Sequence, residues 1–284
     1  MLYPDARCGH DAASPRVRSA MKLSDLYLYP IKSCAPLALE EALVEARGLA
    51  GDRRWMIVDG DGRFITGRQF PELTLVRARP VEGGLTLDAP GMPMLHVAIP
   101  APSQHSAVEI WKKPVAATFA STAAGEWLSR YLGAVARLVY MDETVQRQVD
   151  PDFAREGDIV GFADSFPIML LGRGSLELLN SQLDVPVSMT RFRPNFVIDT
   201  PDPHAEDAWQ RIAIGEMEFD VAKDCTRCNF VNIDPATGRK SHDGQPLKTL
   251  TGYRRFDAGV TFGRHLLPRS SGVVRRGDAV RVLA

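Results

Sequence analysis

The sequence predicts a mostly β protein with a few helices, which is an α+β fold. Short apolar runs bounded by turn residues fill most of the chain after Met21, whereas helical periodicity is confined to two stretches. With 284 residues, 45% of them hydrophobic, the chain is long enough for two domains or for one large domain with a real core. The net charge of -1 gives no overall reason to expect nucleic acid or a membrane surface as a partner.

The first twenty residues contain arginine but lack the apolar core of a secretory signal, and Asp5 and Asp11 argue against a transit peptide. We therefore expect residues 1–20 to form a disordered tail. No window approaches the ~18 apolar residues of a membrane-spanning helix. The four cysteines are too few and too scattered for a disulfide framework, so we expect a reducing compartment and a cytoplasmic protein.

The first half of the chain is rich in β patterns. LSDLYLYP predicts a strand that ends in a proline turn, and residues 53–66 predict a hairpin that turns at residues 59–62. GGLTLDAPG, MLHVAIP and AVEIWKKPVAATF continue in the same style. From Thr122 the period becomes helical; Thr122 can cap the start of this helix and Gly133 can end it.

The second half begins with a polar stretch, residues 141–158, which we interpret as a linker or surface loop. A domain boundary there gives two units, 21–141 and 142–284. Residues 175–183 predict a second amphipathic helix, and TRFRPNFVID has a strand-like pattern that Pro194 restricts to an edge or a strand start. RIAIGEMEFDVAKD predicts a hairpin, and GVVRRGDAVRVLA predicts a strand pair that closes the chain.

Cys225 and Cys228 are three positions apart, and several kinds of site use such a pair. Structural zinc needs four ligands, and no second cysteine or histidine pair is present to complete the set. A redox dithiol should open a helix, whereas this pair follows a predicted strand and precedes the extended run NFVNIDPATG. Two interpretations stay open: a buried free cysteine, or a single thiolate favoured by Lys223 and Arg227 that could ligate a soft or high-valent metal.

Basic residues interrupt several apolar strands. Lys32 and Ser33 follow a strand and a proline turn, where ammonium, hydroxyl and backbone N–H groups can cradle a phosphate. Arg53 and Arg54 would lie on opposite faces of a strand, and an inward arginine needs an anion because a buried unpaired guanidinium is costly. Together with the Arg193-Pro194-Asn195 loop, these residues indicate a pocket for a polyanion with hydrogen-bonding edges.

Four motifs, LYPIKSC, GDRRWMIVD, RFRPNFVID and CTRCNFVNIDPATG, occur in this order along the chain. They resemble the MOSC-domain proteins that carry a MOSC N-terminal β-barrel domain, in the branch of the mitochondrial amidoxime-reducing component and its bacterial relatives. The resemblance covers residues 22–284. It implies a β-barrel-like N-terminal domain followed by a MOSC β-barrel domain with a few helices.

The resemblance also implies a molybdenum cofactor, Mo-molybdopterin, whose pterin dithiolene carries a phosphate. The second cysteine of the motif, Cys228, would be the molybdenum ligand and the catalytic residue. The cofactor-binding positions that the family motifs imply are Lys32, Ser33, Arg53, Asp164, Ser165, Arg193, Asn195, Thr226 and Arg227. Ser165 stands where the family has threonine, and Thr226 stands where relatives have serine. The cofactor would lie between the two domains.

The chemistry implied by the resemblance is reduction of small N-hydroxylated compounds: amidoximes, hydroxylamines and N-oxides. The chain has no four-cysteine iron–sulfur spacing, so we expect electrons from a separate flavoprotein or iron–sulfur protein. Two alternatives are a sulfur carrier or cofactor-delivery protein with a persulfide on Cys228, and a binding protein without turnover. MOSC domains resemble part of the pyridoxal-phosphate-dependent molybdenum cofactor sulfurases; a pyridoxal-phosphate region is not expected in this length, which favours the reductase.

Overall fold

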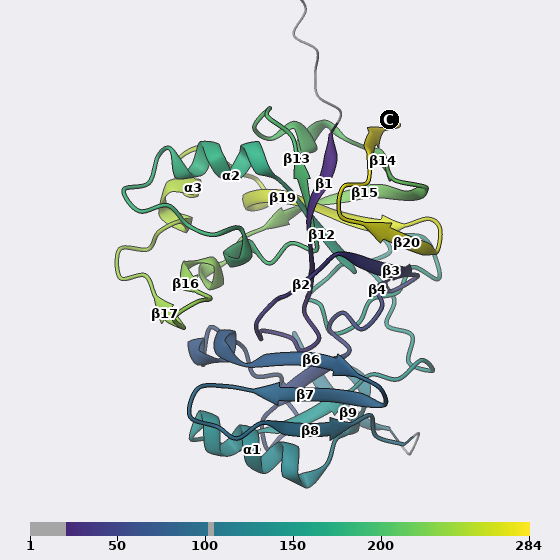
Figure 1. Cartoon of the computed structure of the whole chain (residues 1–284), viewed down its shortest axis with the longest axis vertical. Coiled ribbons are helices and arrows are strands. Elements are labelled where there is room, and N and C mark those ends of the chain that lie inside the picture. The colour runs from purple at the N-terminus through teal and green to yellow at the C-terminus, as the bar shows by residue number, and fades with distance from the viewer. Residues whose placement is uncertain (1–20, 102–104) are drawn as a thin grey trace, which may run out of the picture.

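The computed structural model describes residues 21–101 and 105–284, so the tail expected at residues 1–20 lies outside the described part. Within it, strands far outnumber the three α-helices, which confirms the predicted mostly β fold. One half of the molecule contains a large sheet and the other half contains smaller sheets with one helix against them (Figure 1).

The large sheet has nine strands, of which only β12 and β13 run parallel to each other. In spatial order its strands are β2 (Leu37–Leu39), β1 (Lys22–Leu28), β13 (Phe196–Asp199), β12 (Ile168–Gly172), β19 (Gly259–Pro268), β15 (Met217–Thr226), β14 (Arg211–Ile214) and β21 (Val280–Val282), with β18 (Arg255–Phe256) paired to β19. Phe196 and Phe219 pack edge to face in the apolar core of this half, with ring centroids 5.5 Å apart. The first strand of the described residues, β1, thus lies inside a sheet built mainly by the second half of the chain.

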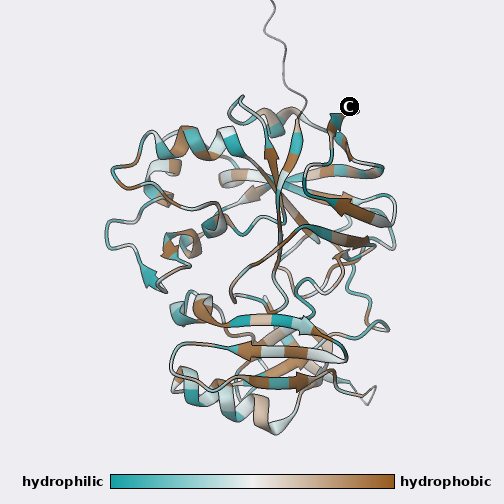
Figure 2. Cartoon of the chain, in the orientation of Figure 1, coloured by the Kyte–Doolittle hydropathy of each residue, from teal (hydrophilic) through white to brown (hydrophobic). Residues whose placement is uncertain are grey.

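Four smaller sheets complete the β structure of the described residues. The first consists of β5 (Trp55–Val58), β11 (Arg137–Tyr140), β10 (Lys113–Phe119) and β9 (Ser106–Ile110), and the second consists of β6 (Arg77–Val81), β7 (Gly84–Asp88) and β8 (Leu95–Ala98). The third consists of β20 (Gly272–Arg275), β3 (Glu41–Glu45) and β4 (Gly48–Leu49), and the fourth pairs β16 (Ile233–Asp234) with β17 (Arg239–Lys240). Hydrophobic and hydrophilic residues alternate along β7 and β8 (Figure 2), as expected for strands with one buried face.

Helix α1 (Thr122–Leu132) packs its apolar face, including Trp127 and Leu128, into the core of the smaller half. Its cap is Ser121 rather than the expected Thr122, because the Ser121 side chain accepts a hydrogen bond from the Ala124 amide. Gly133 ends the helix as predicted, in a left-handed conformation with φ of 63°.

The other helices are short. Helix α2 (Arg173–Asn180) begins and ends earlier than the predicted 175–183, and α3 (Leu247–Tyr253) was not predicted. The 3-10 turns are η1 (Pro71–Leu75), η2 (Met189–Phe192), η3 (Ala205–Ala208) and η4 (Asn229–Asn232). Two of them replace expected extended segments: η2 holds Arg191, and η4 starts directly after Cys228.

The hairpin β14–β15 turns at residues 215 and 216, as predicted. The predicted hairpin over residues 53–66 is reduced to strand β5 and one bridge between Val58 and Phe64. The closing strand pair is wrong, because β20 pairs with β3 and β21 pairs with β14. Each of these strands finds a partner far away in the sequence.

Residues 141–167 join β11 to β12 without a helix or strand of their own, as expected for a loop. This segment is nevertheless packed: Val145 and Val149 are buried, and the Arg147 guanidinium donates to the carbonyls of Gly161 and Ala163. The domain boundary near residue 142 stays a prediction. Among the helices of the described ranges, none has the length and apolar character needed to cross a bilayer.

Candidate functional site

A cavity of about 1010 Å³ lies between the two halves of the molecule. Side chains such as Lys32 and Trp111 line it from the smaller half, and side chains such as Arg193 and Cys228 line it from the larger half. The lysines and arginines around it are Lys32, Arg53, Arg68, Lys113, Arg147, Arg191, Arg193, Lys223 and Arg227, whereas its acidic residues are Asp150 and Asp164. This excess of positive charge suits an anionic ligand.

All the residues that the sequence predicts for the site line this one cavity. They are Lys32, Ser33, Arg53, Asp164, Ser165, Arg193, Asn195, Thr226, Arg227 and Cys228. The antiparallel pairing of β1 with β13 places Leu26 opposite Phe196, so the loop after β1 lies beside the loop before β13. The sheet therefore brings together motifs that are about 160 residues apart in the chain.

Lys32 and Asp164 form an ion pair across the cavity wall. The buried Lys32 Nζ donates to the Phe162 carbonyl at 2.8 Å and to Asp164 Oδ1 at 2.5 Å. Burial lowers the pKa of Lys32, an effect that Asp164 opposes. Burial raises the pKa of Asp164, but the adjacent Lys32 ammonium outweighs it and holds that pKa at about 2. Asp164 and Ser165 present exposed side chains to the cavity.

Arg53 is held by a buried polar network around Asp52. Its Nη1 pairs with Asp52 Oδ2 and donates to Asn195 Oδ1 at 2.9 Å. Asp52 Oδ1 accepts from the Tyr29 amide at 2.9 Å and from Asn195 Nδ2 at 3.1 Å. The Asn195 side chain is fully buried and also bonds to the backbone of Tyr27 and Met169. Asn195 thus orients Arg53 by joining the two halves.

The Tyr29 ring lies beside two guanidinium groups. Arg53 lies 4.3 Å from the ring centroid and Arg193 lies 4.2 Å from it. The Tyr29 hydroxyl donates to the Pro194 carbonyl at 3.2 Å. Burial lowers the pKa of Arg193 to about 10, and its Nη1 donates to the Cys34 carbonyl at 2.7 Å. Cation–π contact stabilises these charges in part, but it does not neutralise them.

Four arginines of the cavity have no carboxylate within salt-bridge distance among the described residues: Arg68, Arg147, Arg193 and Arg227. Arg227 donates to the carbonyls of Phe192 and Phe262, each at 2.8 Å. These four arginines are partly buried, and taking a guanidinium out of water without an anion is unfavourable, so the protein holds this positive charge at a free-energy cost. A polyanionic ligand would remove that cost.

Cys225 and Cys228 differ in environment, although both line the cavity. Cys225 is buried in an apolar cluster, and burial raises the pKa of its thiol. Cys228 is exposed and directly precedes η4. Arg68 Nη1 lies 3.7 Å from its Sγ. The accessible thiol is therefore that of Cys228, and Arg68 is its hydrogen-bonding cation.

Strained backbone concentrates around the cavity. Ser33 (φ 69°), Arg53 (φ 46°), Trp111 (φ 51°) and Arg193 (φ 57°) all line it, although none is glycine. Residues other than glycine rarely adopt this left-handed backbone region. Such strain persists where the surrounding structure enforces it, often at functional sites. The fold thus stabilises a left-handed backbone conformation, which is unfavourable for residues other than glycine, at three of the predicted site residues: Ser33, Arg53 and Arg193.

The two halves also touch at Gly67 and Phe230. A Cβ atom at Gly67 would lie 2.3 Å from Phe230 Cε2, so only glycine allows this approach. The Arg193 guanidinium also lies near Phe230, 5.5 Å from the ring centroid. Gly67, Phe230 and Arg193 all line the cavity, so its shape depends on both halves.

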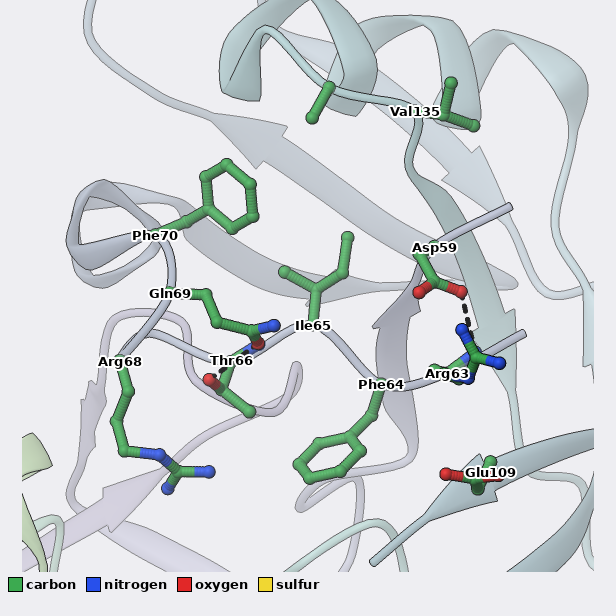
Figure 3. A pocket seen from close by; sticks show the side chains of 11 residues that line it. Asp59, Arg63, Phe64, Ile65, Thr66, Arg68, Gln69, Phe70, Glu109 and Val135 are labelled. Carbon is green, nitrogen blue, oxygen red and sulfur yellow. Dashed lines mark hydrogen bonds between the residues drawn. The ribbon is translucent and has the colours of Figure 1, made fainter. Parts of the chain in front are cut away.

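A second hollow of about 500 Å³ lies in the smaller half and shares Phe64, Thr66 and Arg68 with the main cavity (Figure 3). Ile65 and Phe70 point to one side of this segment, whereas Phe64 and Arg68 point to the other. The segment is thus a thin partition between the two hollows.

Sequence reasoning missed Arg68, Trp111, Arg147 and His265, which also line the main cavity. Arg68 lies within ITGRQFPEL, and Trp111 lies at a hairpin tip where Asn-Gly would be usual, so the unusual turn was a detectable indication. Nothing local marks Arg147, whose orientation depends on carbonyls of its own loop.

Comparison with known proteins gives matches in both halves of the chain. The profile of the MOSC N-terminal beta barrel domain matches residues 20–135, and that of the MOSC domain matches residues 157–281. Mitochondrial amidoxime-reducing component 1 of Mus musculus is 32% identical, over 95% of this chain and 86% of its own length. The proteins of that name from Danio rerio (32% identical; 91% and 83% covered) and Xenopus laevis (30% identical; 91% and 81% covered) are similar to it over almost the same extent.

Proposed function

The chain belongs to the MOSC-domain family, and from this premise we propose that it binds a molybdenum cofactor and reduces N-hydroxylated compounds such as amidoximes, hydroxylamines and N-oxides. The observation that carries the proposal is an exposed cysteine in the wall of a cavity where four of the arginines have no carboxylate within salt-bridge distance among the described residues. The names of the similar proteins, amidoxime-reducing components, support the choice of substrate class.

The residues present fit this cofactor in three respects. Cys228 offers a soft thiolate, which suits molybdenum. Arg53, Arg193 and Lys32 offer cationic donors for the pterin phosphate, and two of these cations already sit on the Tyr29 ring. Asp164 and Ser165 expose polar side chains for the edges of a pterin. The volume of about 1010 Å³ is at the upper end of the ~300–1,000 Å³ usual for ligand pockets.

When bound, the cofactor supplies the two-electron chemistry that cleaves the N–O bond. Overall, an amidoxime, two protons and two electrons give an amidine and water. The protein residues would hold and orient the reactants: Cys228 would ligate the metal, Thr226 and Arg227 would flank that ligand, and Ser33 and Lys32 would bind the cofactor together. The buried network of Asp52 and Asn195 fixes the direction of Arg53 before any ligand arrives.

We propose that the electrons come from a separate flavoprotein or iron–sulfur protein. The described residues contain three free cysteines, Cys34, Cys225 and Cys228, of which only Cys228 is exposed. Four thiolates, the usual ligand set of an iron–sulfur cluster, are not brought together within these ranges. A cytoplasmic location is part of this proposal, since buried free thiols of this kind persist in reducing surroundings.

A sulfur carrier or cofactor-delivery protein with a persulfide on Cys228 is the second candidate. The exposure of Cys228 and its contact with Arg68 favour it as well, because a persulfide anion needs access and a nearby cation. A persulfide does not require a large cavity with several further unpaired arginines, however. The size and charge of the site therefore favour the reductase.

Metal analysis of protein made in a host that synthesises the cofactor tests this proposal. We expect stoichiometric molybdenum, benzamidoxime reduction with a chemical or reconstituted donor, and loss of both in Cys228→Ser. Cys225→Ser is the matched control and should keep its molybdenum, because Cys225 packs into an apolar cluster. Full activity in Cys228→Ala would refute the ligand assignment, and sulfane sulfur without molybdenum would favour the carrier.

A further inference from the structure

The hairpin between β9 and β10 ends in an unusual turn. Ile110 pairs with Lys113, so Trp111 and Lys112 are its two central residues, with φ of 51° and 62°. Turns of this kind normally use asparagine or glycine, because other side chains are strained in the left-handed region. A bulky tryptophan at such a tip calls for a role that offsets the strain.

The Trp111 side chain lines the main cavity. Its indole Nε1 donates to Asp164 Oδ1 at 3.2 Å, so the tip of the hairpin is attached to the loop between β11 and β12. Trp111 is nevertheless 48% exposed, whereas the other tryptophans, Trp55, Trp127 and Trp209, are 4–6% exposed. A tryptophan that served only to connect the hairpin to Asp164 would not need an exposed aromatic surface of this size.

Phe64 and Arg68 extend this aromatic surface towards the thiol. The Phe64 ring centroid lies 5.1 Å from that of Trp111, and the Arg68 guanidinium lies 5.1 Å from the Trp111 ring. Arg68 Nη1 is in turn 3.7 Å from Cys228 Sγ. Phe64 and Arg68 leave their segment on the same side (Figure 3). An indole, a phenyl ring tilted 59° from it and a guanidinium thus adjoin one another in the cavity wall, and the guanidinium reaches the proposed metal ligand. We call the two rings and this guanidinium the aromatic face.

We propose that Trp111 and Phe64 bind the planar aromatic body of the substrate, and that Arg68 directs its N–OH group towards Cys228. The substrate class is thus narrowed to aryl amidoximes and aryl hydroxylamines, neutral or anionic rather than cationic, because Arg68 and Lys113 border the same face. Aromatic groups stack favourably on indole and phenyl rings, and a hydroxyl oxygen accepts from a guanidinium. This inference rests on the proposed function and specifies which substrates it selects.

Ligand binding to the cofactor-free protein tests the aromatic face without turnover. Because Trp111 is the exposed tryptophan, benzamidoxime should quench intrinsic fluorescence saturably, and 4-carboxybenzamidoxime should bind at least as tightly. Equilibrium dialysis of the variants should show about tenfold weaker binding in Trp111→Ala and a smaller loss in Trp111→Phe, which keeps a ring. Unchanged affinity in Trp111→Ala would overturn the inference.

A matched control is Phe256→Ala. Phe256 is 53% exposed and carries the Arg254 guanidinium 5.0 Å from its ring, but it lies outside the cavity-lining set. This variant should bind benzamidoxime as the parent protein does. Equal losses in Phe256→Ala and Trp111→Ala would mean that the effect is general and would overturn the inference.

Kinetics of the loaded protein separate this inference from the proposed function. In Trp111→Ala, kcat/KM for benzamidoxime should fall about tenfold while that for hydroxylamine, which has no ring, is retained. Equal falls for both substrates, or no fall for either, would overturn the aromatic face and leave the reductase standing. If the parent protein reduces neither substrate, the reductase fails, and the binding titration alone decides about the aromatic face.

Discussion

The buried pair of Asp52 and Arg53 allows a prediction in which one contact is removed and the others remain. Asp52 is 3% exposed, and its carboxylate accepts hydrogen bonds on both oxygens. Oδ1 accepts from the Tyr29 amide and from Asn195 Nδ2, and Oδ2 pairs with Arg53. In Asp52→Asn, the new Oδ1 can keep the first two bonds. Its NH2 group then faces Arg53 Nη1, so a charge pair becomes a contact between two donors.

Breaking a buried ion pair from one side costs about 3–5 kcal/mol, because the remaining charge stays buried. We therefore expect the free energy of unfolding of Asp52→Asn to fall by about 3 kcal/mol or more. At roughly 2–4 °C per kcal/mol for chains of about this size, the Tm should fall by about 6–12 °C. Thermal unfolding followed by circular dichroism, together with urea titration, measures both quantities.

Asp88→Asn is the control for this prediction, because Asp88 pairs with Arg77 at 3.8 Å while both side chains are about half exposed or more. Exposed pairs contribute about 0–1 kcal/mol, so this variant should unfold almost as the parent protein does. Adding Arg53→Leu to Asp52→Asn should recover stability, since the uncompensated charge is then gone. Equal Tm values for Asp52→Asn and Asp88→Asn would refute the reasoning.

Three further predictions concern the same cavity. Gly67→Ala should lower the Tm and the cofactor content, because the new Cβ meets the Phe230 ring, and Phe230→Leu should partly rescue both; no loss in Gly67→Ala would contradict the contact. Arg193→Met should raise the Tm of the cofactor-free protein while lowering molybdenum content, since it removes a partly buried charge that has no carboxylate partner among the described residues; a lower Tm of the cofactor-free protein would count against this account. Burial, with a smaller effect of Arg227, lowers the pKa of His265 to about 3, below its usual 6.5, so its stabilising contribution should be present above pH 6.5 and lost as the pH falls towards 3. Urea unfolding of His265→Asn should show a weaker decline over that window, and an unchanged pH profile would refute it.

The sequence predicted which residues line the cavity better than it predicted the orientation of their side chains. Arg53 and Arg193 follow from short motifs, and the structure places both on one ring. By contrast, Arg227 was expected to flank the thiolate and favour it by its charge, whereas its guanidinium bonds to the carbonyls of Phe192 and Phe262. A motif predicts which residue enters a pocket, but these carbonyls belong to η2 and β19, which lie about 35 positions away on either side of Arg227.

Strand content was predictable from local pattern, but pairing depended on distant residues. The β14–β15 hairpin has a tight turn in its own sequence and was predicted correctly. The turn between β20 and β21 looked similar, yet β20 adds to β3 and β21 adds to β14, where each strand meets a partner from another part of the chain. Arg68 was missed for the same reason, since its contact with Cys228 spans 160 positions.

The position of β1 within the large sheet has a consequence for how the protein is made. Lys22–Leu28 leaves the ribosome early, but its partner β13, Phe196–Asp199, is translated about 170 residues later. At ~5–20 residues per second, this strand spends roughly 10–30 s before the edge that faces β13 can pair, although its other edge can already pair with β2. The smaller half can collapse during that interval, so we expect it to appear first as an independent folding unit, with the cavity completed only when the last strands are released.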